Sequence, residues 1–366
     1  MFFHQLLIAA TIASTMIAPS VSPSRPRTAR LSRGPVWTDF RSLAMSEEAQ
    51  RSAKEMLEDK KRIAVVVLAG SQDPSSDVSV FGTLVREGMR FSEQLVLVDT
   101  HTTDRLFADC TTVDAARSVA KKHDIELLVC CQSREPSAIE MVLVQNDAAA
   151  DPTVVSINET DDAVITAAMK TRTRVMNTFD ALPAKNRNAI ESAPNASIAA
   201  IKQWASAAEQ LRNVVTIQDA AKRKEICQEI LSITDQAIAD SPGFLEAYLL
   251  KASCYDELGD EQRLKQTLSD AYSKRDPKRD SPLTILELEG DYARFATRGD
   301  NVMDSYLALL EQNPTDLTAL WSLIDIILSR VPDKITKEDI AEASNLAALL
   351  VASHPDSNVA TAIQTQ

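Results

Sequence analysis

The stretch Arg62-Ile63-Ala64-Val65-Val66-Val67-Leu68-Ala69-Gly70 predicts the founding strand of the amino-terminal half of the chain. A continuous run of β-branched and aliphatic residues that ends at a glycine is typical of a strand buried on both faces of a sheet. The turn-rich segment 70–77 follows it, and apolar residues then recur at helical spacing from Val78 to Phe91. We therefore expect an α/β unit built around residues 62–70.

The segments after this strand alternate between strand and helix patterns. Strands are predicted at 95–98, 125–131, 139–145 and 153–157, and helices at 113–120 and 160–174. The loop at 146–152 indicates a hairpin connection between the last two strands. The predicted order is β-α-β-α-β-β-β-α, which favours a mixed sheet closed by an antiparallel pair.

This order resembles the amino-terminal domain of TolB and its relatives. The resemblance rests on KRIAVVVLAG at residues 61–70 and AARSVAKKHDIELLVCCQSR at residues 115–134, and it covers roughly residues 60–177. It implies a domain that acts in protein association and not in catalysis. We assign residues 62–179 to this α/β domain.

The second half of the chain is predicted to be helical. The Pro-containing segment 180–196 is the expected linker, and residues 197–366 show helical apolar periodicity. Four prolines, spaced by 35, 37 and 41 residues, separate successive pairs of helical patterns at Pro242, Pro277, Pro314 and Pro355. This periodicity predicts a helix-turn-helix solenoid whose units need stacking to bury their apolar faces.

Residues 243–277 resemble a tetratricopeptide (TPR) repeat. The positions that carry the resemblance are Tyr248, Ala252, Tyr255, Leu258-Gly259-Asp260, Leu264, Leu268, Ala271 and Pro277. The resemblance implies peptide or protein binding on the row of first helices. If Tyr248, Ala252 and Tyr255 face the neighbouring helix, the 3.6-residue period places the candidate partner-binding residues on the adjacent stripe at Leu249, Ser253 and Asp256.

The amino terminus allows three interpretations. The apolar run from Leu6 to Ala18, about 13 residues, is short for a bilayer span but fits a secretory signal peptide. We predict a signal peptide at 1–22, then a Pro/Ser/Arg-rich tether and lead-in helix at 23–61, and a periplasmic or secreted protein. The alternatives are translation from Met45, which would give a cytoplasmic regulatory or signalling module, and an organelle transit peptide.

Charge and composition limit the classes of function that we expect. The net charge is -13, and because residues 1–44 hold five Arg and one Asp, the rest of the chain carries -17. Such an acidic body repels phosphate backbones, so nucleic acid is not the expected partner. No later segment reaches transmembrane length. Five cysteines without a Cys-x-x-Cys motif are expected to be mostly buried small hydrophobes.

No motif has the residue types and spacing that a named reaction needs. A Gly-rich phosphate loop is not found among the eight glycines, and no Ser elbow occurs. The segment Asp99 to Asp104 with His101 has residue types that bind metals, but capping and termination of local elements by the two aspartates is the better interpretation. We therefore predict no catalytic, cofactor-binding or metal residues and a protein-binding adaptor of the cell envelope. A divergent hydrolase is the second alternative, and the partner and oligomeric state are left open.

Overall fold

A computed structural model describes most of the chain between residues 45 and 364. The described residues are 45–68, 77–90, 92–135, 138–145, 148–149, 153–156, 162–178, 193–214, 217, 219–297, 302–328 and 336–364. The predicted signal peptide, most of the tether and nearly all of the predicted linker lie outside them. Among the described residues, no helix is both long enough and apolar enough to span a bilayer.

The amino-terminal half contains both strands and helices. In chain order its elements are α2 (Glu47–Leu57), β1 (Lys61–Val67), α3 (Asp77–Met89), β2 (Leu95–Leu97), α4 (Thr100–Phe107), α5 (Val113–Lys122), β3 (Leu127–Glu135), β4 (Ala138–Gln145), β5 (Ala148–Ala149), β6 (Thr153–Ser156) and α6 (Asp162–Thr178).

The strands form one mixed sheet with the order β2-β1-β3-β4-β5, and β6 also pairs with β4. The strand β1 lies between β2 and β3 and is parallel to both, with Ile63 opposite Leu97 on one side and Leu127 on the other. The pairs β3–β4 and β4–β6 are antiparallel. The predicted mixed α/β sheet, with its founding strand and closing antiparallel pair, is confirmed.

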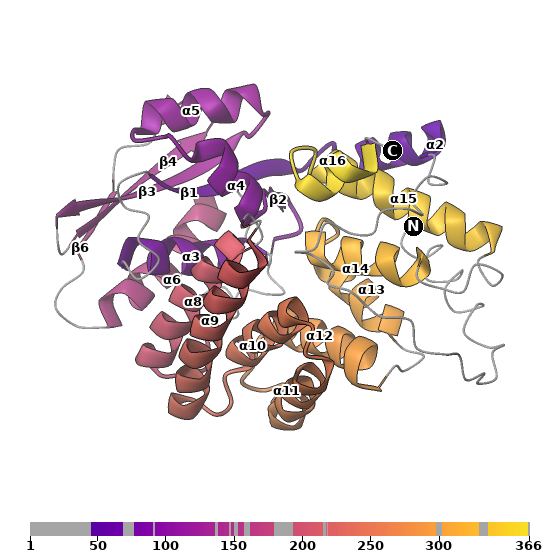
Figure 1. Cartoon of the computed structure of the whole chain (residues 1–366). Helices are drawn as coiled ribbons and strands as arrows, with labels where there is room; N and C mark the ends of the chain where they lie inside the picture. Colours follow the sequence, from indigo (N-terminus) through magenta and orange to yellow (C-terminus); the bar gives the residue numbers. More distant parts are fainter. Residues whose placement is uncertain are drawn as a thin grey trace.

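Helices cover both faces of this sheet (Figure 1). The strand period of two sends Ile63 and Val65 into the core beneath α3, and Ala64 and Val66 into the cluster that also holds Phe107 of α4. Parallel β1 and β2 require a crossover, which α3 supplies, and α4 and α5 connect β2 to β3.

Helix α4 was not predicted. Its N-cap is Asp99, whose Oδ1 accepts a hydrogen bond from the backbone N of Thr102 at 2.9 Å. The interpretation of Asp99 as a helix cap is confirmed. Asp104 lies inside the helix and does not end it.

The second half of the described chain is helical. Its elements are α8 (Ile198–Val214), α9 (Ala220–Asp240), α10 (Leu245–Leu258), α11 (Glu261–Lys274), α12 (Pro282–Asp291), the π-helix η3 (Tyr292–Thr297), α13 (Val302–Gln312), α14 (Leu317–Leu328), α15 (Lys337–Ser353) and α16 (Asn358–Gln364).

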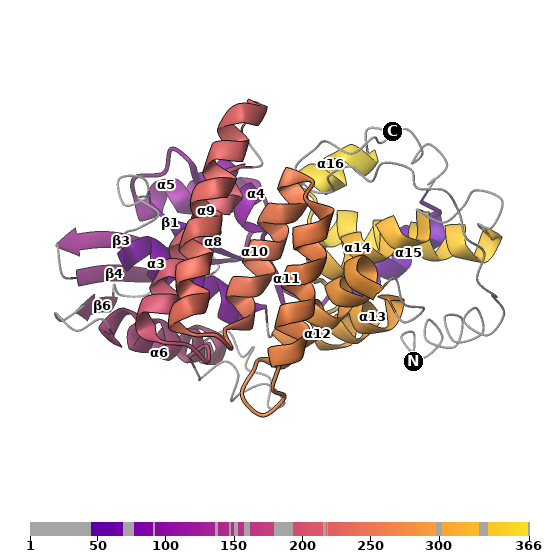
Figure 2. The same ribbon diagram turned by 60° about the horizontal axis from the view of Figure 1, so that its bottom comes forward.

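These helices follow one another in space in nearly the order of the chain (Figure 2). Each of α8, α9 and α10 packs against the next helix, and so do α13 and α14. In addition α10 packs against both α8 and α12, which places the first helices of successive pairs side by side. The lead-in helix α2 packs against α15, so the first and last parts of the described chain meet.

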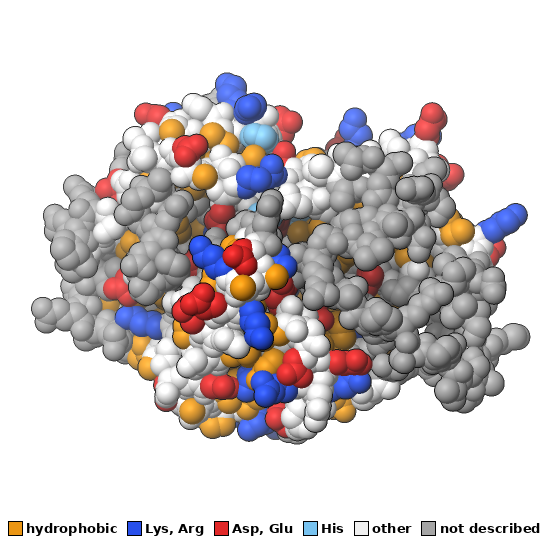
Figure 3. Space-filling model, in the orientation of Figure 1, with side chains coloured by type: hydrophobic (Ala, Val, Ile, Leu, Met, Phe, Trp, Pro, Cys, Tyr) orange, Lys and Arg blue, Asp and Glu red, His pale blue; other side chains and the backbone are white. Residues whose placement is uncertain are grey.

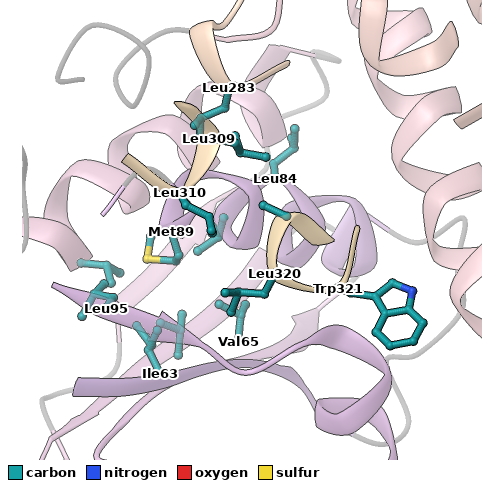
Figure 4. Close-up of a cluster of buried hydrophobic side chains, with 14 of the residues drawn as sticks. Ile63, Val65, Leu84, Met89, Leu95, Leu283, Leu309, Leu310, Leu320 and Trp321 are labelled. Atoms are coloured by element: carbon teal, nitrogen blue, oxygen red, sulfur yellow. The ribbon is translucent and has the colours of Figure 1, made fainter. Parts of the chain in front are cut away.

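Helix α3 lies between the sheet and the helical half. Of its 13 residues, 11 are buried, because α3 packs against the sheet, against α6 of the α/β half and against α8 of the helical half. The two halves share one hydrophobic core, in which Val65 and Leu84 lie close to Leu310 and Leu320 (Figure 4). A core of this extent couples the sheet to the helical layer by burial of apolar surface.

Candidate interaction surface

The hairpin of α10 and α11 carries the predicted partner-binding residues. Gly259 ends α10 in the left-handed conformation, with φ of 69°, and the backbone N of Asp260 donates to the carbonyl of Tyr255 at 2.9 Å. Asp260 then caps α11 by accepting a hydrogen bond from the backbone N of Arg263 at 3.1 Å. The Leu-Gly-Asp sequence therefore makes the turn because glycine accepts the positive φ and aspartate caps the next helix.

The two helices of this hairpin are held together by an apolar cluster. Its buried members are Leu245, Tyr248, Ala252, Tyr255, Leu264, Leu268, Ala271 and Leu288. The prediction that Tyr248, Ala252 and Tyr255 face the neighbouring helix is confirmed by this packing.

The predicted stripe lies on a different side of α10. Leu249 is half-buried at the border of the cluster, Ser253 is exposed, and Asp256 is half-buried. The Ser253 hydroxyl donates to the Leu249 carbonyl at 3.0 Å. Ala247, in contrast, belongs to the main core shared with the α/β half. The helical period separates the stripe from Ala247 by roughly half a turn, so this stripe faces away from the shared core.

Half-buried aromatic side chains border the same cluster. Tyr292 and Phe295 of η3 pack against it from the outside, as Leu249 does. The ring of Tyr292 stacks on Tyr272 of α11, with centroids 4.1 Å apart and an interplanar angle of 14°. The guanidinium of Arg275 lies 3.4 Å from the centroid of the Tyr272 ring. We call Tyr272, Arg275, Tyr292 and Phe295 the aromatic rim.

The π-helix η3 positions part of this rim. It continues directly from α12, and the residues around the junction are tied to α13 and α14. The Tyr306 hydroxyl donates to Asp291 Oδ1 at 2.6 Å, and Arg294 pairs with Asp325. Burial raises the pKa of Asp291, although the Tyr306 hydrogen bond opposes this rise. π-helical turns are rare and often occur at functional sites, so the exposed side of η3 is a candidate for part of a functional surface.

A second polar cluster fixes the helical half to α3. Arg90, just beyond the end of α3, pairs with Glu287 of α12 at 3.1 Å and with Asp316 at 3.2 Å. The Asn313 side chain donates to the Arg90 carbonyl at 3.1 Å. Burial raises the pKa of Glu287 to about 7, and Arg90 opposes this rise. Sequence reasoning missed this cluster because its partners lie more than 190 residues apart along the chain.

The turn between α15 and α16 contacts the α/β half at a second place, away from the Arg90 cluster. Asp356 Oδ2 lies 2.8 Å from Arg62 Nη2, and Asp356 Oδ1 lies 2.9 Å from His123 Nδ1. Burial opposes ionisation of Asp356, but the hydrogen bonds from Arg62 and His123 lower its pKa. His123 is the C-cap residue of α5. This contact and the Arg90 cluster hold the two halves together at separate points.

The His, Cys, Asp and Glu side chains of the described residues are the groups that could bind a metal ion or act as nucleophiles. No cluster of three or more His, Cys, Asp or Glu side chains in that part of the chain could hold a metal ion. Burial raises the pKa of the Cys130 thiol to about 12, which opposes a reactive thiolate at neutral pH. Cys130 and Cys131 belong to cores on opposite faces of the sheet, because neighbouring side chains in a strand point to opposite faces.

The side chains of α10, α11 and α12 form a mixed surface in which hydrophobic patches alternate with charges of both signs (Figure 3). The stripe and the aromatic rim together are the candidate interaction surface of this chain. The chain matches no protein-family model, no curated protein and no solved structure.

Proposed function

We propose that this protein is a non-catalytic adaptor that binds a protein or peptide partner on the stripe and the aromatic rim. The observation that carries the proposal is the stacked Tyr272–Tyr292 pair beneath Arg275, next to half-buried Phe295. Tyrosine and arginine are enriched among the residues that contribute most to protein interfaces, because they combine large apolar area with a polar group.

The burial of one face of α10 supports the choice of this surface. The apolar face of α10 that holds Phe244 and Ala247 is part of the shared core and is not available to another chain. The stripe of Leu249, Ser253 and Asp256 lies on a side of the same helix that the shared core leaves uncovered. A partner of the helical half would therefore meet the stripe and not the inner face.

The proposal extends to the arrangement and location of the protein. The side-by-side packing of α8, α10 and α12 supports a TPR-like helical array, in which the first helices of neighbouring pairs stack. The apolar run from Leu6 to Ala18 supports export, and hence an adaptor in the periplasm or outside the cell.

Charge and bulk substitutions in the stripe test the binding surface. We expect Asp256→Lys and Ser253→Arg to weaken a partner recovered by pull-down by roughly tenfold, which corresponds to about 1.4 kcal/mol. The exposed Glu229 on α9 gives a matched control, because Glu229→Lys makes the same charge change outside the surface. Circular dichroism and thermal melting of all three variants are measured alongside.

The proposal stands if partners are lost from the two stripe variants and kept by Glu229→Lys, with all three proteins folded. Equal recovery from the three folded variants would remove the stripe as a binding surface. The helical half would then serve only to cover α3 and the sheet.

A further inference from the structure

Helices α9 and α10 pack in antiparallel register, and this register brings two cysteines together. Arg223 of α9 lies 3.4 Å from Glu257 of α10, and further along Asp235 lies 2.5 Å from Lys251. Residues 224–234 of α9 and 252–256 of α10 lie between these two ion pairs and so pack against each other. One turn inward from the first pair, Cys227 of α9 stands opposite Cys254 of α10.

Both cysteines are fully buried in one small apolar cluster. Cys227 and Cys254 each have 0% of their surface exposed and share the cluster with Ala207, Val214 and Ile230. Their thiols are joined by a hydrogen bond. This hydrogen bond lowers the pKa of Cys227, and it and burial raise the pKa of Cys254. Cys227 is therefore the thiol of the pair that more readily forms the thiolate, which is the form that attacks a disulfide.

We propose that Cys227 and Cys254 are a site of disulfide formation by exchange with a low-molecular-weight disulfide. The Cys227 thiolate attacks one sulfur of the small disulfide, forms a mixed disulfide and releases one small thiolate. The Cys254 thiolate then attacks Cys227 sulfur and releases the second small thiolate. The two protein thiols are oxidised, the small disulfide is reduced to two thiols, and the two protons pass to solvent and the leaving thiolates.

The bond would join two successive helix pairs. The cysteine of α9 belongs to the pair α8–α9, and that of α10 belongs to the pair α10–α11. A covalent link here limits the conformations of the unfolded chain and prevents the two pairs from separating. The helix that carries Leu249, Ser253 and Asp256 would thereby be fixed to its neighbour.

Peptide mapping tests the proposal on the full chain. One sample of folded protein is incubated with oxidised glutathione, and a second is refolded in a glutathione redox buffer, since burial slows attack on the folded protein. After alkylation and trypsin cleavage at Lys224, Lys251 and Arg263, we expect peptide 225–251 to be linked to peptide 252–263. The linked protein should melt roughly 5 °C higher than the reduced protein.

Matched variants identify the pair. Cys227→Ser and Cys254→Ser should abolish the linked peptide and the rise in melting temperature, whereas Cys110→Ser, which removes a buried thiol elsewhere, should keep both. Linkage of these two peptides in either wild-type sample supports the proposal whether or not the variants fold. Alkylation of both cysteines in both samples, or a link to a different cysteine, would overturn it.

Discussion

At the residue scale, Glu287 is a carboxyl whose ionisation the fold shifts toward neutral pH. It is about one-fifth exposed, it pairs with Arg90, and the carboxylates of Asp291, Asp316 and Glu87 also act on its charge. Burial and the three other carboxylates favour the protonated form, and Arg90 favours the charged form. The net result is a pKa raised to about 7, which places this titration near neutrality.

This raised pKa predicts a pH dependence of stability. The carboxyl of an unfolded glutamate has a pKa of about 4.3. The folded state therefore holds the proton more strongly, so the stabilisation is complete below about pH 4 and is lost as pH rises through about 7, by roughly 4 kcal/mol. We expect Glu287→Gln to flatten the dependence of the unfolding free energy on pH in this window.

Urea unfolding at several pH values measures this effect. Glu311→Gln, a change at an exposed carboxyl on α13, is the matched control and should keep the wild-type slope. Parallel curves for wild type and Glu287→Gln between pH 4 and 7 would show that Glu287 does not titrate there.

At the element scale, α3 depends on close packing against α6. A Cβ atom at Gly88 would lie 2.7 Å from Arg172 Nε and closer still to two carbons of the same side chain. That arginine is buried and donates from Nε to the Leu84 carbonyl at 2.6 Å, so it cannot move without losing this bond. The glycine is thus required by the approach of the two helices.

Substitution of this glycine tests the packing. Gly88→Ala should lower the unfolding free energy by about 1 to 2 kcal/mol, because overpacking exceeds the gain in helix propensity. Gly243→Ala is the control, since no heavy atom lies within 4 Å of its added Cβ, and it should change stability by no more than about 0.5 kcal/mol. Equal unfolding midpoints for the two variants in urea would contradict tight α3–α6 packing.

At the scale of the whole molecule, the shared core predicts that the α/β half depends on the helical half. A fragment spanning residues 62–179 would expose the side of α3 that Leu310, Leu320 and their neighbours cover. We expect this fragment to bind a hydrophobic dye, to aggregate on size-exclusion chromatography and to melt without cooperativity. The full chain, as control, should melt cooperatively. A monomeric fragment with a sharp transition would instead make the shared core a docking interface between two independent domains.

Much of the local structure follows from the sequence. The apolar run at 62–68 makes a buried strand, Thr112 caps α5, and Gly259 with Asp260 makes the turn between α10 and α11. These features depend on residues within a few positions of one another, so periodicity and capping rules predict them. Helix α4 was missed because only two of its eight residues, Leu106 and Phe107, are apolar.

The contacts between the halves were decided only by the tertiary structure. Arg90 meets Glu287 across 197 residues, and Arg62 meets Asp356 across 294. The pairing of Cys227 with Cys254 depends on the register of two packed helices, and the burial of α3 on both sides depends on a layer formed by the other half of the chain. Local propensity carries no information about which distant surfaces meet, because that choice is made by the collective burial of apolar surface and the pairing of buried charges.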